Sequence, residues 1–514
     1  MHILTSASIR EADRRTIREV GVPASVLMES AGRAVVRTLI ERIEDLASRS
    51  VVIVCGKGGN GGDGLVVLRT LANLGYDARA VVLAPFENLS AEALDNLQAA
   101  LKLGLAVESA PTAETWADVL AHLAGADVVV DALFGTGLTE PLRALPRQVI
   151  EDMNSLDTIR VALDVPSGLS SDTGAVPGVA FDADLTVALA APKVCHFLPP
   201  ASELCGEVVV VEIGIPPRFL ESSEPKLETI DPSMLAMPRR KRVSHKGTYG
   251  HLLILAGSRG KAGAAVMAAE AALRSGVGLV TVASAESAIP MMAQRLPEAM
   301  WEALPETHSG AVSAKAEARV RELLRDRQAL ALGPGLGTED DTVALVCAVV
   351  SASEIPTVVD ADGLNALARD AGRIPAGRAL ALTPHPGEAG RLLGSTVKEI
   401  ESDRLASVRE LARRTKAHVL LKGHRTLVSD PRGNVLVNLT GNPGMATGGT
   451  GDVLTGILGS LLAQGVDIEE ALPLGVHVHG LAGDLAAADV GETSLVATDL
   501  IEKLPAALRS LGAD

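Results

Sequence analysis

Short apolar runs rich in valine, isoleucine and leucine alternate along the chain with longer stretches in which apolar positions recur at helical spacing. The first apolar runs predict strands at residues 50–56, 78–84, 126–132, 158–165, 183–190 and 206–213. Between most of them lie amphipathic stretches such as GLVVLRTLANLG at 64–75, which predict helices. Strands that alternate with helices favour a mostly parallel sheet covered by helices, so the pattern predicts an α/β fold.

The start of the first helix is predicted from SIRE at residues 8–11, which has the spacing of a capping box. In that arrangement Ser8 would cap the helix and Glu11 would reach back to the backbone of Ser8.

The alternation stops at residues 214–246, where five prolines and the basic cluster Arg239–Arg242 occur. Because proline interrupts helices and strand ladders, we place a domain boundary here, between domains at 1–220 and 226–514. The basic cluster either contacts a phosphate or, as we favour, forms a solvated face of the linker. The alternation then resumes and predicts strands at 251–257, 278–284, 328–337, 356–363, 379–388, 417–423 and 425–430.

Composition narrows the class of protein. A chain of 514 residues is too long for one hydrophobic core, which also favours two domains. The net charge of −16 argues against nucleic acid or an anionic membrane as the main partner. The four cysteines lack CxxC spacing, which argues against a zinc site or a disulfide framework and fits a reducing compartment.

The N-terminal residues MHILTSASIREADRR lack the apolar core of a signal peptide. No apolar run reaches the roughly 18 uncharged residues that a membrane span needs. We therefore expect a cytoplasmic protein without a membrane partner, and we expect it to form a homo-oligomer.

Gly56, Gly58 and Gly61 have GxGxxG spacing directly after a predicted strand and before a predicted helix. In that context the glycines let backbone amides approach a pyrophosphate at a helix N-terminus. The acid that binds the ribose in such folds is absent from the second strand, which ends VVLAPFE. The pattern disfavours a hydride-transferring domain and leaves two interpretations, a phosphate-binding loop and a tight turn.

Polar side chains follow the ends of three predicted strands: Asn60 and Asp63, Asp131, and Asp164 with Ser167. Ligands of open α/β sheets bind beyond the carboxyl ends of the strands. Oxygen groups gathered there could hold a cation or move a proton, although each aspartate alone could also serve as a turn residue.

The motifs GGNGGDG, VVVDALFGTGL and LDVPSG occur in this order and resemble the YjeF N-terminal domain, the NAD(P)H-hydrate epimerase family, over about residues 1–215. Family members usually carry Asn-Asn-Gly-Gly-Asp in the first loop, and here Gly59 replaces the first asparagine. The resemblance implies a Rossmann-like three-layer αβα domain, with a potassium ion at Asn60, Asp131 and Ser167.

The resemblance also implies the residues that bind the hydrated nicotinamide nucleotide in the 59–63 loop, the 135–141 turn and at Asp164. They are Gly59, Asn60, Gly61, Gly62, Asp63, Gly135, Thr136, Gly137, Leu138, Pro141 and Asp164. Asp164 is our candidate acid/base for the epimerisation.

A second glycine-rich stretch, GNPGMATGGTGDVLTG at 441–456, precedes a predicted helix. Gly448, Gly449 and Gly451 leave backbone amides free, which predicts an anion hole for a transferring phosphoryl group. Asp452 could accept a proton from an attacking hydroxyl. Asp452 could instead be only a helix cap, but capping does not explain six glycines. The chain has no GxxxxGK[ST] motif, which excludes a P-loop.

Other strand ends add Lys422 and Gly423 in LLKGHRT, and His385 and Glu388 in LTPHPGE. Together with HKGTYGH, AGSRGKAGAA, GPGLG, DADGLN and the second glycine-rich stretch, they resemble the YjeF C-terminal domain over about residues 230–510. That domain is a ribokinase-like NAD(P)H-hydrate dehydratase. The two domains in one chain resemble the family of bifunctional NAD(P)H-hydrate repair enzymes.

This second resemblance implies two sets of binding residues. ADP or ATP, with Mg²⁺, is expected at Lys422, Gly423, His424, Arg425, Thr426, Gly448, Gly449, Thr450 and Gly451. The hydrated cofactor is expected at Ala264, Gly335, His385 and Asp452.

The implied activity is the repair of hydrated NADH and NADPH. The first domain would interconvert the R and S forms, and the second would dehydrate the S form at the expense of ADP or ATP, with ADP favoured. Asp452 would help the ring hydroxyl attack the terminal phosphate, because phosphate leaves more readily than hydroxide. A vitamin or sugar kinase, an NAD-dependent dehydrogenase and a first domain that only binds a ligand remain alternatives.

Overall fold

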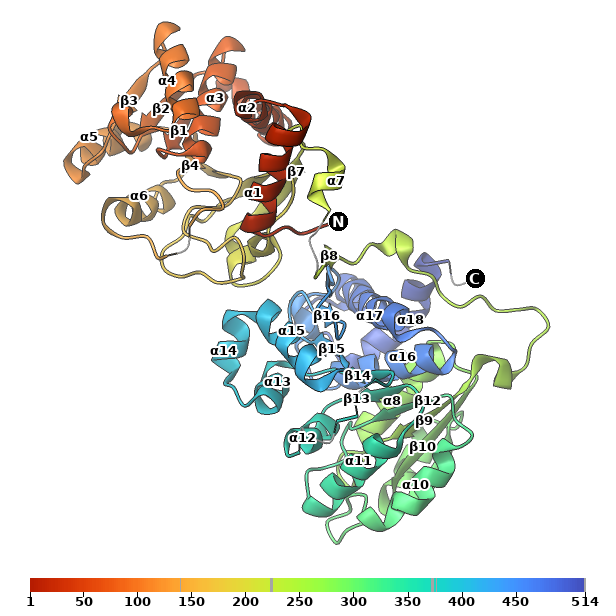
Figure 1. Cartoon of the computed structure of the whole chain (residues 1–514). Helices are drawn as coiled ribbons and strands as arrows, with labels where there is room; N and C mark the ends of the chain where they lie inside the picture. Colours follow the sequence, from red (N-terminus) through yellow and green to blue (C-terminus); the bar gives the residue numbers. More distant parts are fainter. Residues whose placement is uncertain (139, 222–224, 371–373, 376, 513–514) are drawn as a thin grey trace. The chain divides into compact units, whose positions relative to one another are not determined.

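The computed structural model describes residues 1–138, 140–221, 225–370, 374–375 and 377–512. They form two compact units, one of His2–Ser223 and one of Glu224–Asp514 together with Met1 (Figure 1). Each unit has its own sheet and is described by itself.

The first unit is built on a seven-stranded parallel sheet. In spatial order the strands are β3 (Val107–Ser109), β2 (Ala78–Val82), β1 (Val51–Cys55), β4 (Val128–Ala132), β5 (Ile159–Leu163), β6 (Leu185–Leu189) and β7 (Glu207–Val211). The helices are α1 (Ser6–Arg15), α2 (Ala24–Arg42), α3 (Gly59–Asn73), α4 (Ala91–Lys102), α5 (Ala113–Leu123), α6 (Ala144–Asn154) and α7 (Pro217–Leu220), with a π-helical turn at Thr16–Val20.

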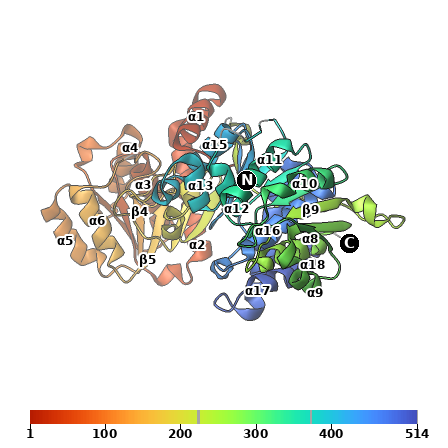
Figure 2. The same cartoon turned by 90° about the horizontal axis from the view of Figure 1, so that it is seen from below.

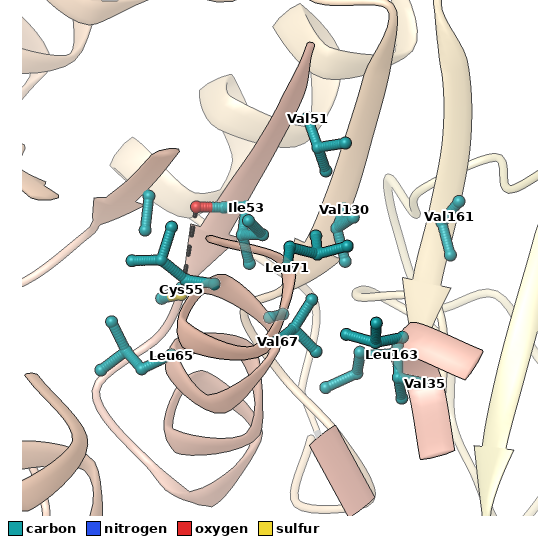
Figure 3. Close-up of a cluster of buried hydrophobic side chains, with 14 of the residues drawn as sticks. Val35, Val51, Ile53, Cys55, Leu65, Val67, Leu71, Val130, Val161 and Leu163 are labelled. Atoms are coloured by element: carbon teal, nitrogen blue, oxygen red, sulfur yellow. Dashed lines mark hydrogen bonds between the residues drawn. The ribbon is translucent and has the colours of Figure 1, made fainter. Parts of the chain in front are cut away.

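Alternate residues of the strands enter two different cores, as the two-residue period of a strand requires. Val51 and Ile53 pack with residues of α2, α3 and α4 in one cluster (Figure 3). Val52 and Val54 face the other way and pack with residues of α5 and α6. The sheet is therefore covered by helices on both faces, which is the predicted Rossmann-like three-layer αβα arrangement.

The predicted capping box at Ser8 and Glu11 is wrong. The cap is Thr5 and the first helix begins at Ser6, three residues earlier than predicted, because Thr5 is extended and its side chain accepts a hydrogen bond from the backbone amide of Ser8 (3.2 Å). Glu11 accepts a hydrogen bond from Nε of Arg14 (2.8 Å) instead of reaching back.

The second unit is built on a ten-stranded sheet, parallel except where β16 runs antiparallel to both its neighbours. In spatial order the strands are β11 (Met300–Leu304), β10 (Leu279–Ala285), β9 (His251–Leu255), β12 (Ala329–Leu332), β13 (Thr357–Val359), β14 (Leu380–Leu382), β15 (His418–Leu421), β16 (Leu427–Ser429), β17 (Val435–Val437) and β8 (Leu227–Thr229). The helices are α8 (Ala262–Arg274), α9 (Ile289–Arg295), α10 (Glu317–Leu324), α11 (Asp340–Ala352), α12 (Asp362–Ala368), α13 (Pro386–Leu393), α14 (Val397–Ser402), α15 (Arg404–Thr415), α16 (Thr450–Ala463), α17 (Ile468–Val490) and α18 (Ala497–Ser510).

Close packing of α16 against α8 fixes the position of the second glycine-rich stretch. Both views show α8, α16 and α18 side by side (Figures 1 and 2). A Cβ on Gly456 of α16 would overlap the carbonyl oxygen of Ala268 on α8, so the two helices touch backbone to backbone. With aromatic residues only 2% of the chain, cores of this kind rely on small and aliphatic side chains.

The segment 214–246, where the sequence predicted a domain boundary, also contributes a strand. Residues 227–229 form β8, which pairs in parallel with β17 at the edge of the second sheet. The basic cluster Arg239–Arg242 is exposed, and the guanidinium of Arg240 lies over the ring of Tyr249, 4.2 Å from its centroid.

Four free cysteines, Cys55, Cys195, Cys205 and Cys347, are all buried. Burial raises the pKa of Cys55 and Cys195 and raises that of Cys205 to about 12, so these thiols stay protonated. Across the part of the chain that the structure describes, no helix is long and apolar enough to cross a membrane.

Candidate active sites

The first candidate site lies at the carboxyl ends of β1, β4 and β5, which are neighbours in the first sheet. A Cβ on Gly61 would overlap the carbonyl of Gly56, and a Cβ on Gly56 would overlap the carbonyl of Leu133. These two glycines therefore serve close packing, as the tight-turn interpretation requires. Gly58 and Gly59 have no such neighbour within 4 Å, so the loop also presents open backbone.

Asp131, the fourth residue of β4, is fully buried and bonded to Ser167. Its Oδ2 accepts from the Ser167 amide and its Oδ1 from the Ser167 hydroxyl, both at 2.7 Å, while the Leu133 amide donates to Oδ1 at 3.1 Å. Burial raises the pKa of Asp131 to about 6, against the opposing effect of these hydrogen bonds. The pair is a buried, oxygen-rich cluster at the carboxyl end of β4.

Asn60 and Asp164 meet on either side of the turn that begins at Gly135. A Cβ placed on Gly135 would stand 3.4 Å from Oδ2 of Asp164 and 3.6 Å from Oδ1 of Asn60. Nδ2 of Asn60 is buried and has no hydrogen-bond partner among the described residues. The structure thus brings together Asn60, Gly135 and Asp164, and separately Asp131 and Ser167.

The rest of the 135–141 turn is more varied. Leu138 packs against the core under α5 and α6, Pro141 is exposed, and the carbonyl of Thr136 accepts from the Ser171 hydroxyl (3.5 Å). Gly137 has open space around it, and Thr139 lies outside the described residues. The turn is therefore largely open to solvent on the side away from the core.

Sequence reasoning missed two further residues near this site, Asp13 and Lys193, which affect the predicted residues Asp63 and Asp164. Burial and the negative charges of Asp164 and Asp13 raise the pKa of Asp63 well above its usual range. Asp13 comes from α1, far from the motifs, and its own pKa is raised by burial. Lys193 contacts Asp164 directly through an ammonium that is fully buried. Its only sequence signal is a lysine next to proline in an otherwise apolar stretch.

The second candidate site lies at the N-terminus of α16. Gly449 precedes the helix in the left-handed region (φ 97°), where its Cβ would crowd Met267 at 2.6 Å, so glycine is required. Gly448 has nothing within 4 Å of a Cβ position, which leaves its backbone open. Thr450, Gly451 and Asp452 form the first turn, so Asp452 lies at the positive end of a helix of 14 residues.

Lys422, after β15, is paired with Asp360, after β13. Nζ of Lys422 lies 2.6 Å from Oδ1 of Asp360, and the Thr455 hydroxyl of α16 donates to Oδ2 of Asp360 at 2.8 Å. A Cβ on Gly451 would stand 3.3 Å from the same Nζ, so the ammonium lies against the first turn of α16. Asp360 lies in the DADGLN motif, but the motif alone does not indicate it as a site residue.

The surroundings of Asp452 raise the pKa of its carboxyl group. Burial and the charge of Asp360 raise its pKa to about 6, while Lys422 acts in the opposite direction. His479 on α17 contacts the carbonyl of Thr450 through Nε2 (2.8 Å), and burial lowers the pKa of His479 to about 4. A neutral His479 therefore donates this hydrogen bond and holds the first turn of α16.

His385 and Glu388 form a capping box at the start of α13. The Gly387 amide donates to Nδ1 of His385 (3.0 Å), and the His385 amide donates to Oε2 of Glu388 (2.9 Å). Glu388 also lies 3.9 Å from Nζ of Lys422. The loop from His385 to Glu388 is therefore linked to the lysine at the N-terminus of α16.

The remaining predicted nucleotide residues lie in the loop between β15 and β16. Arg404, which is buried, donates to the carbonyls of Lys422 (3.3 Å) and His424, so it fixes this loop from beneath. Arg425 has a left-handed backbone (φ 57°), and the Thr426 hydroxyl donates to the Gly423 carbonyl at 3.1 Å. Sequence reasoning missed Arg404, which lies on α15 and gives no local motif.

The two residues predicted for the hydrated cofactor besides His385 and Asp452 are neighbours in the structure. A Cβ on Gly335 would stand 3.2 Å from Cβ of Ala264, at the start of α8. Asp362 lies nearby, because it accepts from the Gly337 amide (2.8 Å) and pairs with Lys261 (3.1 Å).

The described residues include no group of three or more histidine, cysteine, aspartate or glutamate side chains that could hold a metal ion. The oxygen groups above suit ions that bind weakly to few protein ligands.

Fold and sites together define a class: a protein of two α/β units, the first Rossmann-like and the second built on a ten-stranded mixed sheet, with acids at strand ends and at a glycine-rich helix start. Residues 24–195 match the family model of the YjeF-related protein N-terminus, and residues 252–506 match that of NAD(P)H-hydrate dehydratase. The chain belongs to the family of bifunctional NAD(P)H-hydrate repair enzymes, as the sequence motifs predicted.

The family assignment rests on relatives that match this chain over nearly their full length. The chain is 42% identical to the bifunctional NAD(P)H-hydrate repair enzyme Nnr of Thermofilum pendens, over 100% of this chain and 97% of the relative. It is also 42% identical to the enzyme of that name from Moorella thermoacetica, over 99% of this chain and 97% of the relative. A crystal structure of the ADP/ATP-dependent NAD(P)H-hydrate dehydratase of Bacillus subtilis, co-crystallised with ATP and Mg²⁺, is 32% identical, with a TM-score of 0.48 over 54% of this chain and 95% of that chain.

Proposed function

We propose that the first unit interconverts the R and S forms of hydrated NADH and NADPH, and that the second unit dehydrates the S form with ADP or ATP as phosphoryl donor. The observation that carries the second activity is Asp452, a carboxyl whose pKa is raised to about 6 at the mouth of α16, behind Gly448 and Gly449. A base of that pKa is matched to proton transfer near neutral pH.

In the proposed dehydration, Asp452 takes the proton of the ring hydroxyl while the hydroxyl oxygen attacks the terminal phosphorus of ADP or ATP. The P–O bond to the rest of the nucleotide breaks, and AMP or ADP leaves. The backbone amides after Gly448 and the ammonium of Lys422 stabilise the charge that develops on the transferring group. The nitrogen lone pair of the ring then expels phosphate, and loss of a proton from the adjacent carbon restores the dihydronicotinamide. His385, Ala264 and Gly335 are proposed to hold the hydrated ring.

Mg²⁺ is proposed to enter with the nucleotide. Mg²⁺ commonly keeps several waters and binds through substrate phosphates and one or two carboxylates, which suits a site without a dedicated cage. The carboxylates of Asp360 and Glu388, which lie 2.6 Å and 3.9 Å from Nζ of Lys422, are the groups here that could hold Mg²⁺, which would neutralise phosphate charge when bound.

In the proposed epimerisation, Asp164 takes the proton of the ring hydroxyl, and the bond between the hydroxyl-bearing carbon and the ring nitrogen breaks to leave an aldehyde. Closure of that bond on the other face of the aldehyde, with return of the proton, gives the other epimer. The ring would be held between the loop at Asn60 and the turn at Gly135. The side chains of Asn60 and Asp164 both flank Gly135, which supports placing the ring there. The product is the S form that the second unit uses.

A potassium ion is proposed beside Asp131, Ser167 and Asn60. The chemistry of the donors fits, since Asp131 and Ser167 are bonded to each other and offer a carboxylate and a hydroxyl, and Asn60 beside Gly135 offers an amide oxygen. Equal epimerisation rates and equal melting temperatures of the first unit in potassium, sodium and choline chloride would remove the ion. We expect potassium to raise both above the other two salts, and Asp131→Ala to abolish the difference.

The deciding experiment for the overall function starts from hydrated NADH and ADP or ATP. We expect the near-ultraviolet absorbance of the dihydronicotinamide to return, with one phosphate released per ring restored. A vitamin or sugar kinase would instead give a stable phosphorylated product and no gain of absorbance. Nucleotide consumption without restored cofactor would therefore refute the proposal.

A further inference from the structure

Lys193 is a fully buried lysine that none of the steps above uses. Its side chain is 0% exposed, and it lies in the segment that follows β6. Removing an ammonium from water is costly unless it is paired and hydrogen-bonded. A fully buried ammonium therefore needs partners that offset the cost of its burial.

The partners of Lys193 are Asp164 and the end of β6. Nζ donates to Oδ1 of Asp164 and to the carbonyl of Leu189 (2.8 Å). The Leu189 amide donates to the same Oδ1 at 3.0 Å. Two donors thus hold one oxygen of the carboxylate.

The other oxygen of Asp164 faces a different way. Oδ2 accepts no hydrogen bond from the described residues and lies 3.4 Å from the Cβ position of Gly135. It points at the turn that we assign to the substrate. The two oxygens of this carboxylate therefore have separate surroundings, one bound to the protein and one open toward the turn.

The backbone of Asp164 is held by the same segment. Nδ1 of His196 accepts from the Lys193 amide (3.1 Å), so Nε2 carries the proton and donates to the Asp164 carbonyl (3.0 Å). Burial lowers the pKa of His196 to about 4, which keeps the ring neutral. Asp164 has φ 65°, a conformation that a non-glycine residue keeps only when its surroundings enforce it.

We propose that Lys193 is a positioning residue for the epimerisation: it fixes Oδ1 of Asp164 so that Oδ2 is presented to the hydrated nicotinamide ring. The inference rests on the proposed function of Asp164 as the group that moves the proton. Lys193 touches Asp164 and not the substrate, so its effect belongs to the rate of the chemical step more than to binding.

The test follows epimerisation alone, in the full-length chain without ADP or ATP, from purified single epimers separated by chromatography. Lys193→Met keeps the length of the side chain and removes the ammonium. Because misplacing a catalytic group by about 1 Å can cost about a hundredfold, we expect kcat to fall roughly tenfold to a hundredfold with little change in KM.

A double-variant cycle separates this inference from the assignment of Asp164. We expect Asp164→Asn to lower kcat by about 10²–10⁴, and Asp164→Asn with Lys193→Met to be no slower than Asp164→Asn alone, within about twofold. Full activity of Asp164→Asn would refute the proposed base. An inactive Asp164→Asn beside a folded Lys193→Met with unchanged kcat would refute only the role of Lys193, as would a double variant much slower than Asp164→Asn.

The matched control is Lys102→Met, which removes an exposed lysine at the end of α4 and should leave kcat unchanged. Thermal unfolding followed by circular dichroism shows which variants fold. If Lys193→Met does not fold, Lys193→Gln replaces it, because its amide can still donate to Oδ1 without the charge. An intermediate kcat for Lys193→Gln supports the proposal, and wild-type kcat overturns it.

Discussion

At the scale of single residues, the two candidate bases, Asp164 and Asp452, have neighbours of opposite charge. Asp164 is bonded to the ammonium of Lys193, which fixes one of its oxygens. Asp452 has Asp360 as a neighbouring charge, and burial with that charge raises its pKa to about 6. One carboxylate is fixed in direction and the other is tuned in basicity, which fits two different proton transfers.

Exchanging each aspartate for asparagine should separate the two activities, because the side-chain size is kept and the base is lost. Asp452→Asn should still interconvert the R and S forms but restore no NADH, a loss of about 10²–10⁴ in rate. Asp164→Asn should restore NADH quickly from the S form and slowly from the R form. Normal NADH recovery by a folded Asp452→Asn enzyme would contradict the assignment of the base.

The dehydration should also depend on pH in a defined direction. A base acts in its deprotonated form, so kcat should fall as the pH drops below about 6, the raised pKa of Asp452. Asp360→Asn removes a charge that raises this pKa and frees Lys422, which lowers it, so both effects should move the fall to lower pH. Normalised kcat–pH profiles of the two enzymes measure the shift, and coincident profiles would count against Asp452 as the titrating base.

Sequence alone could predict Asp131, Asp164 and Asp452 as site candidates, because each stands next to a strand end or helix start marked by glycines. It could not predict Lys193, Arg404 or His479. Arg404 and His479 contact site residues 18–29 positions away, and their burial follows from packing and not from a local pattern. Lys193 resembles a surface lysine until the fold places it under Asp164.

At the scale of elements, the contact of α16 with α8 supports the second site, since α16 carries both Asp452 and Thr455. Small residues make the contact, and Gly456 touches the backbone of Ala268. Any shift of α16 away from α8 would move Asp452 relative to Lys422.

We therefore expect Gly456→Ala to destabilise the second unit by about 1–3 kcal/mol, the usual cost of overpacking a close contact. Gly448→Ala is the matched control, because open space surrounds its Cβ position, and it should change the free energy of unfolding by less than about 0.5 kcal/mol. Urea unfolding of both variants measures the difference. Equal stability of the two would show that α16 can move without cost.

Most strands were predictable because they lie in continuous apolar runs, and this holds even for the three-residue strands β13, β14 and β16. The pattern missed β3, β8, β11 and β17, and the five residues MWEAL of β11 contain a central glutamate. β3, β8 and β17 each have three residues, too few to show a period, and β8 and β3 carry a central glutamate. The reversal of direction at β16 depends on pairing with distant strands, which the local pattern does not encode.

At the scale of the whole molecule, the two sheets and their cores are separate, so each unit contains the packing that it needs. We expect the fragments 1–220 and 226–514 to fold and to keep epimerase and dehydratase activity, respectively. The second fragment retains β8, whose neighbour Lys226 donates to Asn434 (2.8 Å) and accepts from Val435 (2.9 Å).

A fragment 231–514 is the control, because it lacks β8 and leaves the edge of β17 unpaired. It should melt at a lower temperature than 226–514 and aggregate more readily. Soluble, folded fragments that have lost both activities would show that the units depend on each other.

The four buried thiols can serve as native probes of local opening. An aqueous alkylating reagent reaches a buried sulfur only when the surrounding structure opens, so the labelling rate under native conditions measures how often that region opens. Cys55 lies in the core of the first unit and Cys347 on α11 of the second. Mass spectrometry of peptides containing each cysteine can therefore time the opening of each half of the enzyme in one experiment, with and without substrate, on the unmodified chain.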